Sequence, residues 1–381
     1  MTQPWGNQPP RNQPPQWNQP QWNHAGNGPW NQPSFGTSPQ AQGPSSANFG
    51  RAPQGPGFGG SQLGQPHYAP GQFTPPAPRR RNPLRGLLLA LMGLALIAFV
   101  GFVVVNLVSP TSNVAYQNDD YEVPPPDKSP PPLPLPETYE QAQQFVAANP
   151  FYQQTAPIPV RCNAQPINVA TADDAQLKAH FETLMECTVR VWQPPVEGAG
   201  FQIVRPTVTI YGKEITTKCG KAEVNAFYCS ADQQVYFSNL LPDYVAIVKE
   251  DKWAADVVMA HEFGHSLQAR TGILISSHAL GQNSNDDAFE LEMSRRLETQ
   301  ADCFAGMFTR AVSRSLNIQQ TDLAGIDATF EAVGDDTLTG KPNVVGNHGR
   351  GATRQYWGDI GLGTSDVGKC NTFTADKSLV R

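Results

Sequence analysis

The chain has 381 residues, of which 39% are hydrophobic and 16% are charged, and its formal net charge is -6. Its length would allow two domains, but the first 78 residues contain almost nothing with which to build a core, which excludes a globular domain there. Acidic residues outnumber basic ones, and no nucleic-acid partner is expected.

Residues 1–78 are dominated by Gln, Asn, Pro, Gly and Ser. A segment of this composition cannot bury enough apolar surface to offset the entropy of ordering its backbone, so we predict a disordered tail. Four tryptophans depart from this composition: Trp5, Trp17, Trp22 and Trp30. They could bind a cytoplasmic partner or another copy of the chain, and a spacer with incidental aromatic residues is the alternative.

Residues 79–108 combine a basic flank with an apolar run. Residues 86–108 are apolar apart from Asn106, and four arginines precede them: Arg79, Arg80, Arg81 and Arg85. About 20 apolar residues span a bilayer, so one transmembrane helix is predicted. A cleavable signal peptide is disfavoured, because the run starts too deep in the chain and is too long. The positive-inside rule then places the tail in the cytoplasm and the rest outside, in a single-pass protein of a cell membrane.

The cysteines provide an independent indication of this topology. All of them follow the apolar run: Cys162, Cys187, Cys219, Cys229, Cys303 and Cys370. An even number confined to the exported side is typical of an oxidising compartment. A pair between Cys219 and Cys229 is favoured, because a short loop rich in turn residues separates them. The chain has no C-x-x-C sequence, so a structural zinc site built from thiols is a minor alternative.

Residues 109–136 are rich in proline, which favours an extended polyproline-type linker that holds the exported part away from the membrane. The folded domain is expected over residues 137–381. It should begin with a short helix from Thr138 to Ala148. A longer helix has Thr171 as its N-cap and should end before Pro194 and Pro195.

Two strands are predicted next. Residues 201–211 alternate between apolar and polar side chains, as a half-buried strand does. A turn at residues 230–233 leads into a second strand that begins at Val235. At the edge of a sheet this strand could pair with an extended peptide through backbone hydrogen bonds. An interior position is equally compatible with the pattern.

Residues 257–270 contain an H-E-x-x-H sequence, formed by His261, Glu262 and His265. Residues four apart lie on one face of a helix, so the two imidazoles could hold one zinc ion. Glu262 would lie beside the metal and could move a proton from a zinc-bound water to a leaving amine. Ala260 and Gly264 leave room for a second helix to approach closely. Two histidines on a partly buried helix, without a metal, are the alternative.

A catalytic zinc site takes three protein ligands and leaves one position open, so a third donor is needed. Glu298, in the predicted helix over residues 295–306, is the candidate. Asp302 lies one turn further on and could accept the free N–H of a ligand imidazole. Like charges at this spacing mildly destabilise a bare helix, which favours a nearby cation. An ordinary surface pair of acidic residues is the alternative.

Several blocks of sequence follow one another in a characteristic order. They are Phe227-Tyr228-Cys229 with Ala231-Asp232-Gln233 and Val235-Tyr236, His261-Glu262-Phe263-Gly264-His265, Glu298-Thr299-Gln300-Ala301-Asp302-Cys303-Phe304-Ala305-Gly306, His348-Gly349 with Arg354, and Cys370-Asn371-Thr372-Phe373. Over most of residues 155–375 this order resembles the bacterial family of neutral zinc metallopeptidases. The resemblance implies an α+β, zincin-like domain of the gluzincin kind. It also implies Zn²⁺ as cofactor, Glu298 as third ligand and a Cys303–Cys370 disulfide.

The function expected is therefore that of a membrane-anchored, extracytoplasmic zinc peptidase acting on peptides or proteins. His348 and Arg354 are candidates for stabilising the tetrahedral oxyanion, although Arg354 could instead tie its helix to a carboxylate. One alternative is a membrane-tethered binding or scaffold protein with a non-catalytic metal site. Another is a zinc hydrolase of a non-peptide component of the cell envelope. The complete set of base, ligands and neighbouring acid favours an enzyme.

Overall fold

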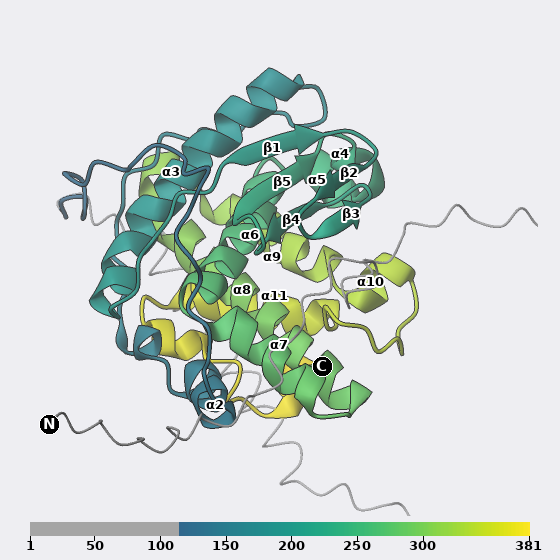
Figure 1. The fold of residues 1–381 in the computed structure, drawn as a ribbon. Helices are drawn as coiled ribbons and strands as arrows, with labels where there is room; N and C mark the ends of the chain where they lie inside the picture. Colours follow the sequence, from purple (N-terminus) through teal and green to yellow (C-terminus); the bar gives the residue numbers. More distant parts are fainter. Residues whose placement is uncertain (1–113) are drawn as a thin grey trace, which may run out of the picture. The chain divides into compact units, whose positions relative to one another are not determined.

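Residues 114–381 are described by the structure, a computed structural model, as an α+β arrangement of helices with a small sheet (Figure 1). This confirms the predicted α+β class. The predicted tail and the predicted transmembrane segment at residues 86–108 lie outside the described residues. Within residues 114–381, every helix is too short or too polar to cross a bilayer.

The first helix, α2 (Tyr139–Ala147), lies where the sequence predicts it. The Thr138 hydroxyl accepts a hydrogen bond from the Gln141 backbone N–H at 3.1 Å, which satisfies one of the free donors at the helix start. The helix ends before Asn149 and Pro150, and a short 3₁₀ helix, η1 (Pro150–Gln153), follows it. Its buried Phe151 packs against Trp192 and Phe304 in the core.

The long helix α3 (Asp174–Gly198) differs from its prediction at both ends. Its N-cap is Asp173 and not Thr171, because Asp173 and Gln176 form a reciprocal capping box. The helix also continues through Pro194 and Pro195. Pro194 has no N–H to donate to the Arg190 carbonyl. The Asn118 side chain donates to that carbonyl instead, at 2.8 Å, and so replaces the missing hydrogen bond.

A three-stranded sheet has the order β1 (Val208–Tyr211), β5 (Gln234–Ser238), β4 (Ala226–Cys229). β1 runs parallel to β5, and β4 runs antiparallel to it. The turn at residues 230–233 and the following strand are confirmed. That strand is β5, the central one, so of the two positions considered for it the interior one is correct and the peptide-binding edge is not. A separate hairpin is formed by β2 (Ile215–Thr217) and β3 (Gly220–Ala222).

The strand predicted over residues 201–211 is present only in its last four residues, as β1. In residues 201–205, two backbone carbonyls form hydrogen bonds with groups outside the sheet. The Gln202 carbonyl accepts from the Arg270 side chain at 2.9 Å, and the Arg205 carbonyl accepts from the Asp127 backbone N–H at 2.9 Å. These partners take the backbone groups that a longer strand would have used.

The remaining regular elements of the described residues are helices. The helices are α4 (Leu241–Tyr244), α5 (Ala246–Glu250), α6 (Ala254–Arg270), α7 (Ile273–Asn283), α8 (Asp287–Leu316), α9 (Leu323–Ala332) after η2 (Gln320–Asp322), α10 (Asp335–Thr339), α11 (Gly351–Gly363), η3 (Val367–Cys370) and η4 (Lys377–Val380). α3 and α6 pack against the sheet, and α8 packs against both α6 and α11 (Figure 1). The element at the centre of this packing is α6, in which every residue except Val258 is buried.

The close approach of α6 and α8 depends on Gly264, as the sequence predicts. A Cβ atom added to Gly264 would lie 3.0 Å from the Ala301 Cα atom, closer than packed side chains normally come. The N-terminal end of α6 is held from another direction. Buried Asp256 accepts a hydrogen bond from His180 of α3, with 2.6 Å between its Oδ1 and His180 Nε2.

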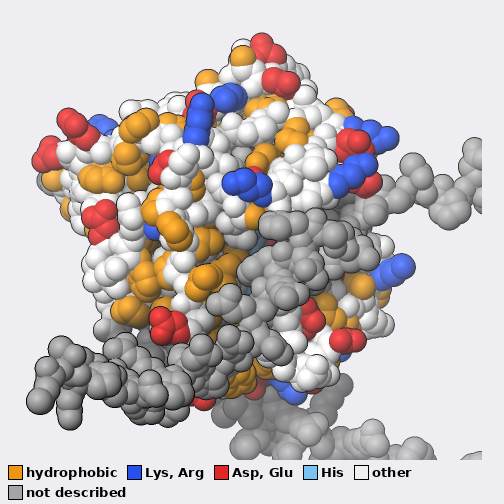
Figure 2. Space-filling view, viewed as in Figure 1, with side chains coloured by type: hydrophobic (Ala, Val, Ile, Leu, Met, Phe, Trp, Pro, Cys, Tyr) orange, Lys and Arg blue, Asp and Glu red, His pale blue; other side chains and the backbone are white. Residues whose placement is uncertain are grey.

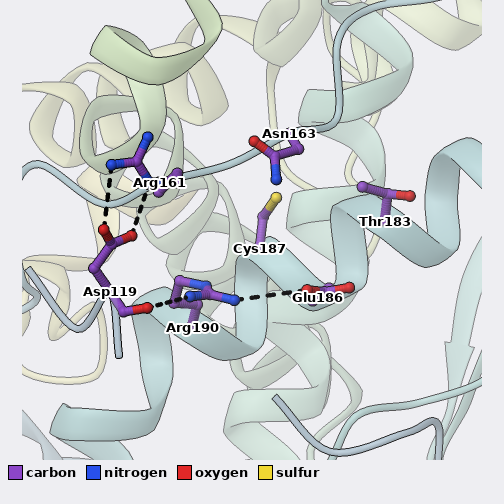
Figure 3. Close-up of a pocket in the computed structure, with 7 residues that line it drawn as sticks. All are labelled: Asp119, Arg161, Asn163, Thr183, Glu186, Cys187 and Arg190. Carbon is purple, nitrogen blue, oxygen red and sulfur yellow. Dashed lines mark hydrogen bonds and ion pairs between the residues drawn. The ribbon is translucent and has the colours of Figure 1, made fainter. Parts of the chain in front are cut away.

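Residues 114–136 lie against the domain and do not project from it. Arg161 forms an ion pair with the Asp119 carboxylate at 2.9 Å, and Arg190 donates to the Asp119 carbonyl at 3.0 Å (Figure 3). Further along, the Pro131 carbonyl accepts from Arg270 at 2.9 Å and from Gln233 at 2.9 Å. The packed structure therefore includes residues on the N-terminal side of Glu137, where the domain was expected to begin.

All six cysteines are paired in disulfides. The pairs are Cys162–Cys187, Cys219–Cys229 and Cys303–Cys370. The second is the pair predicted from the loop between its cysteines, and the third is the pair implied by the family resemblance. On the face seen in Figure 2, basic and acidic side chains are interspersed.

Candidate metal centre

Two helices bring the predicted ligands together. His261 and His265 project from one face of α6, and their Nε2 atoms lie 3.1 Å apart. Glu298 reaches them from α8. Its Oε2 lies 3.3 Å from His261 Nε2, and its Oε1 lies 3.5 Å from His265 Nε2. All three side chains are buried, and together they form a group that could hold a metal ion.

The spacing of these donor atoms fits zinc. Bonds of about 2.0–2.1 Å in a tetrahedral site place neighbouring donors roughly 3.3 Å apart. The two imidazole nitrogens are 3.1 Å apart, and each has one Glu298 carboxylate oxygen at a similar distance, 3.3 Å for His261 and 3.5 Å for His265. Two imidazoles and one carboxylate are also a donor set used by catalytic zinc, which leaves the fourth position open.

The other nitrogen of each imidazole is hydrogen-bonded. His261 Nδ1 lies 2.8 Å from Asp302 Oδ1, as the sequence predicts for Asp302. His265 Nδ1 lies 2.9 Å from the side-chain oxygen of Gln268. Both partners are acceptors, so each Nδ1 carries the proton and each Nε2 keeps a lone pair directed at the common centre.

Arg354 of α11 is buried and bound to Asp302 in a bidentate pair, with Nε–Oδ2 at 2.8 Å and Nη2–Oδ1 at 2.9 Å. Burial alone would raise the pKa of Asp302, but Arg354 and His261 together lower it. Arg354 therefore keeps Asp302 ionised as an acceptor for His261. This is the second of the two roles considered for Arg354, in which it ties its helix to a carboxylate.

Glu262 lies next to the ligands but is held by the sheet. The backbone N–H of Tyr228, in edge strand β4, donates to Glu262 Oε2 at 2.8 Å. Burial raises the pKa of Glu262 to about 7, against the opposing effect of His261. A carboxylate with a pKa near neutrality is suited to taking up and releasing a proton.

His348 is brought to the same region by the loop before α11. Burial raises the pKa of Glu298, but His265, His261 and His348 outweigh it and lower this pKa well below its usual value. His348 is oriented by Asp335, which lies 3.2 Å from its Nδ1 and accepts from its backbone N–H at 3.1 Å. The side chain is 21% exposed.

Three features of this region were not predicted from the sequence: Gln268, Asp335 and the Tyr228 N–H. Gln268 left a detectable signal, because it follows His265 by three residues and so shares its helix face. Asp335 and Tyr228 left none. Their partners are 13 and 34 residues away in the chain, and only the fold brings them together.

Comparisons with known proteins agree with this geometry. A family model described as "Putative neutral zinc metallopeptidase" matches residues 144–373, which is more than half of the chain. The chain belongs to this family. It is 30% identical over 208 residues to an uncharacterized protein of Mycobacterium tuberculosis, Rv2575, and this match covers 49% of the chain and 67% of the relative. It is also 30% identical over 203 residues to the uncharacterized protein YpfJ of Escherichia coli, covering 50% and 69%. No solved structure matches the chain.

Proposed function

We propose that this protein is a zinc-dependent peptidase with a zincin-like active site. The observation that supports it most directly is the buried group of His261, His265 and Glu298, whose donor atoms lie close enough together to hold one metal ion, next to a buried carboxylate, Glu262. Membership of a family described as zinc metallopeptidases supports the same conclusion. When bound there, zinc supplies Lewis acidity and makes water a stronger nucleophile.

The protein's own residues divide the reaction between them. Glu262 takes a proton as a water oxygen adds to the carbonyl carbon of a peptide bond. It then returns that proton to the amide nitrogen, and the C–N bond breaks to give an amine and a carboxylic acid, which loses its remaining proton to become a carboxylate. The Tyr228 N–H keeps the Glu262 carboxylate aimed during both transfers. His348, held by Asp335, donates a hydrogen bond to the developing oxyanion.

The substrate is proposed to be an extended peptide. Strand β4 forms one edge of the sheet and packs against α6, beside Glu262. An open strand edge can accept a further strand through backbone hydrogen bonds. The edge is therefore provided by β4, and not by the strand from Val235, for which an edge was one of two positions considered.

A direct test compares the full-length parent with Glu262→Gln. Both are expected to bind zinc, because Glu262 is not one of the three donors. The parent should cleave an unfolded protein, and the variant should be slower by at least about 10²–10⁴-fold, the usual contribution of a general base. Equal background hydrolysis by zinc-loaded parent and variant would favour the scaffold function over the enzyme.

We also infer that residues 86–108 anchor the protein in a membrane with the domain outside the cytoplasm. The arginines before the segment and the three disulfides after it support this arrangement. The tail has no cysteine and all six cysteines are paired, so one introduced cysteine in the tail can be labelled selectively. A membrane-impermeant reagent should leave it unlabelled in intact cells. Labelling would show that the tail lies outside the cytoplasm, which contradicts this orientation.

A further inference from the structure

A chain of buried side chains leads away from the metal ligand His265. The Gln268 side-chain oxygen faces His265 Nδ1 at 2.9 Å, and the Gln268 amide nitrogen donates to the Leu297 carbonyl at 2.8 Å and to Gln300 Oε1 at 3.2 Å. The Gln300 amide nitrogen in turn donates to the Tyr152 hydroxyl at 2.9 Å and to the Cys370 carbonyl at 3.0 Å. Tyr152 completes the chain by donating to the Val146 carbonyl at 3.1 Å.

Each N–H or O–H group in this series of hydrogen bonds has one acceptor, and this fixes the direction in which the series runs. A side-chain amide has two N–H groups and one oxygen. Both N–H groups of Gln268 are used, one by a backbone carbonyl that can only accept. Rotating the Gln268 amide by 180° would place its oxygen against the Leu297 carbonyl and against Gln300 Oε1. In the dry interior such an unsatisfied contact costs about 1–3 kcal/mol per group.

The far end of the chain is fixed in the same way. Rotating the Gln300 amide would turn its oxygen toward the Cys370 carbonyl and its N–H groups toward those of Gln268. The Cys370 carbonyl is itself held in place, because Cys370 forms a disulfide with Cys303 of α8. Both glutamines are 0% exposed, so water cannot replace a lost partner.

The two histidines are therefore oriented by different means. His261 has a charged acceptor, Asp302, which Arg354 keeps ionised. His265 has a neutral acceptor whose direction is imposed by the hydrogen bonds behind it. A second carboxylate in place of Gln268 would add negative charge to a buried region that already contains Glu262, Glu298 and Asp302. An amide provides the acceptor without that charge.

We propose that Gln268 is a positioning residue for the metal ligand His265, and that Gln300 and Tyr152 hold it in its working orientation. This series of hydrogen bonds keeps the His265 proton on Nδ1 and directs the Nε2 lone pair toward the metal site. This proposal rests on the proposed zinc site, but not on the identity of the substrate or on peptide hydrolysis.

The test measures zinc affinity and tautomer on the full chain. Gln268→Met removes the acceptor at nearly constant volume, and zinc affinity, measured by competition with a chelator, should fall by about 10–100-fold. Gln234→Met is the matched control. Gln234 is a buried glutamine of β5 that also makes several hydrogen bonds, to Thr207 and Asp127, but it has no link to His265. Its loss should lower the melting temperature and leave zinc affinity unchanged.

The tautomer provides a readout that needs neither metal nor activity. In the ¹⁵N-histidine-labelled, metal-free chain, His265 should be protonated at Nδ1, and its resonances are identified by their absence in His265→Asn. Tyr152→Phe removes the hydroxyl at the end of this series of hydrogen bonds, and part of the His265 population should then be protonated at Nε2. This variant keeps the proposal testable if Gln268→Met does not fold. Parent-like zinc affinity in folded Gln268→Met, or an Nε2-protonated His265 in the parent, would overturn the proposal. A zinc-binding parent without peptidase activity would contradict only the proposed function.

Discussion

Asp335 illustrates how one side chain can act on the site through another. Its carboxylate accepts from His348 Nδ1 and from the backbone N–H groups of His348 and Gly349. These contacts fix both the loop and the ring. They make Asp335 a positioning residue and leave His348 to contact the substrate in the proposed reaction.

Replacement of Asp335 by Asn should therefore slow turnover without loss of metal. The amide keeps the size of the carboxylate but removes the charge that orients His348. We expect kcat to fall by about tenfold or more, but by less than the roughly 10²–10³-fold typical of removing an oxyanion donor, here His348→Ala. Asp336→Asn is the control, because Asp336 accepts from the Gly351 N–H and has no contact with His348. A loss of bound zinc in Asp335→Asn would contradict this assignment.

Asp359 of α11 and Asp327 of α9 share a hydrogen bond away from the ligands. Burial and the neighbouring Asp327 raise the pKa of Asp359 from 3.8 to about 7. The folded state therefore holds this proton more tightly than the unfolded state does. Its contribution to stability is complete below about pH 4 and is lost as the pH rises to about 7.

Asp359→Asn should remove this penalty at high pH. We expect the melting temperature at pH 8 to rise by about 2–4 °C relative to the parent, and the difference to shrink toward zero at pH 4. Thermal unfolding followed by circular dichroism across this range measures both values. An increase of the same size at every pH would show that packing, and not ionisation, is responsible.

At the scale of single residues, the two histidines of the candidate metal centre, and the acidic pair on α8, were predictable because the spacing within each pair is local. His261 and His265 are one turn apart, as are Glu298 and Asp302. Their supporting partners were not predictable in the same way. Gln300 meets Tyr152 across 148 residues and Cys370 across 70, and no sequence pattern relates positions so distant.

Among the helices, the separation of α6 and α8 determines whether Glu298 can reach the two histidines. Gly264→Ala would place a methyl group against the Ala301 backbone at 3.0 Å. Neither helix can yield easily, because both are buried there. We expect a cost of about 1–3 kcal/mol in the free energy of unfolding and weaker zinc binding.

Chemical denaturation and chelator competition measure these two effects of Gly264→Ala. Gly212→Ala is the matched control, since an added Cβ there meets nothing within 4 Å. It should change the free energy of unfolding by less than about 0.5 kcal/mol. Unaltered zinc affinity in a destabilised Gly264→Ala would mean that the site tolerates a wider helix separation.

Helix ends were predicted less well than helix positions, and α3 shows why. Pro194 normally predicts a helix end, because it removes a donor and crowds the preceding turn. Here a donor from Asn118, 72 residues earlier in the chain, satisfies the Arg190 carbonyl. Local rules fail where a distant part of the fold provides what the local sequence lacks.

For the described molecule as a whole, the α+β class could be predicted from the sequence, but the start of the folded part could not. The high proline content of residues 109–136 predicted a free linker. Composition does not reveal that Arg161, Arg190 and Arg270 provide partners for this segment. The charges that bind it come from α3, from α6 and from the loop before α3.

A double-mutant cycle tests whether the segment stabilises the domain. Asn118→Gly keeps the positive φ of 53° accessible but removes the donor to Arg190, and it should cost about 1–3 kcal/mol in the free energy of unfolding. Pro194→Ala restores an N–H to the same carbonyl. In that background Asn118→Gly should cost less by at least about 0.5 kcal/mol. Equal costs in both backgrounds would show that Asn118 does not replace the missing bond.

The binding of residues 114–136 has a consequence for chimeric proteins. Similarity to the family begins at residue 144, whereas the groups that satisfy Arg190 and Arg270 come from residues 118 and 131. Grafting only the matched span behind a foreign leader would remove the Asn118 donor to the Arg190 carbonyl and the Pro131 acceptor of Arg270. Arg270 is the last residue of α6, the helix that carries both histidines. A functional chimera should therefore start before residue 144 and include residues 114–136.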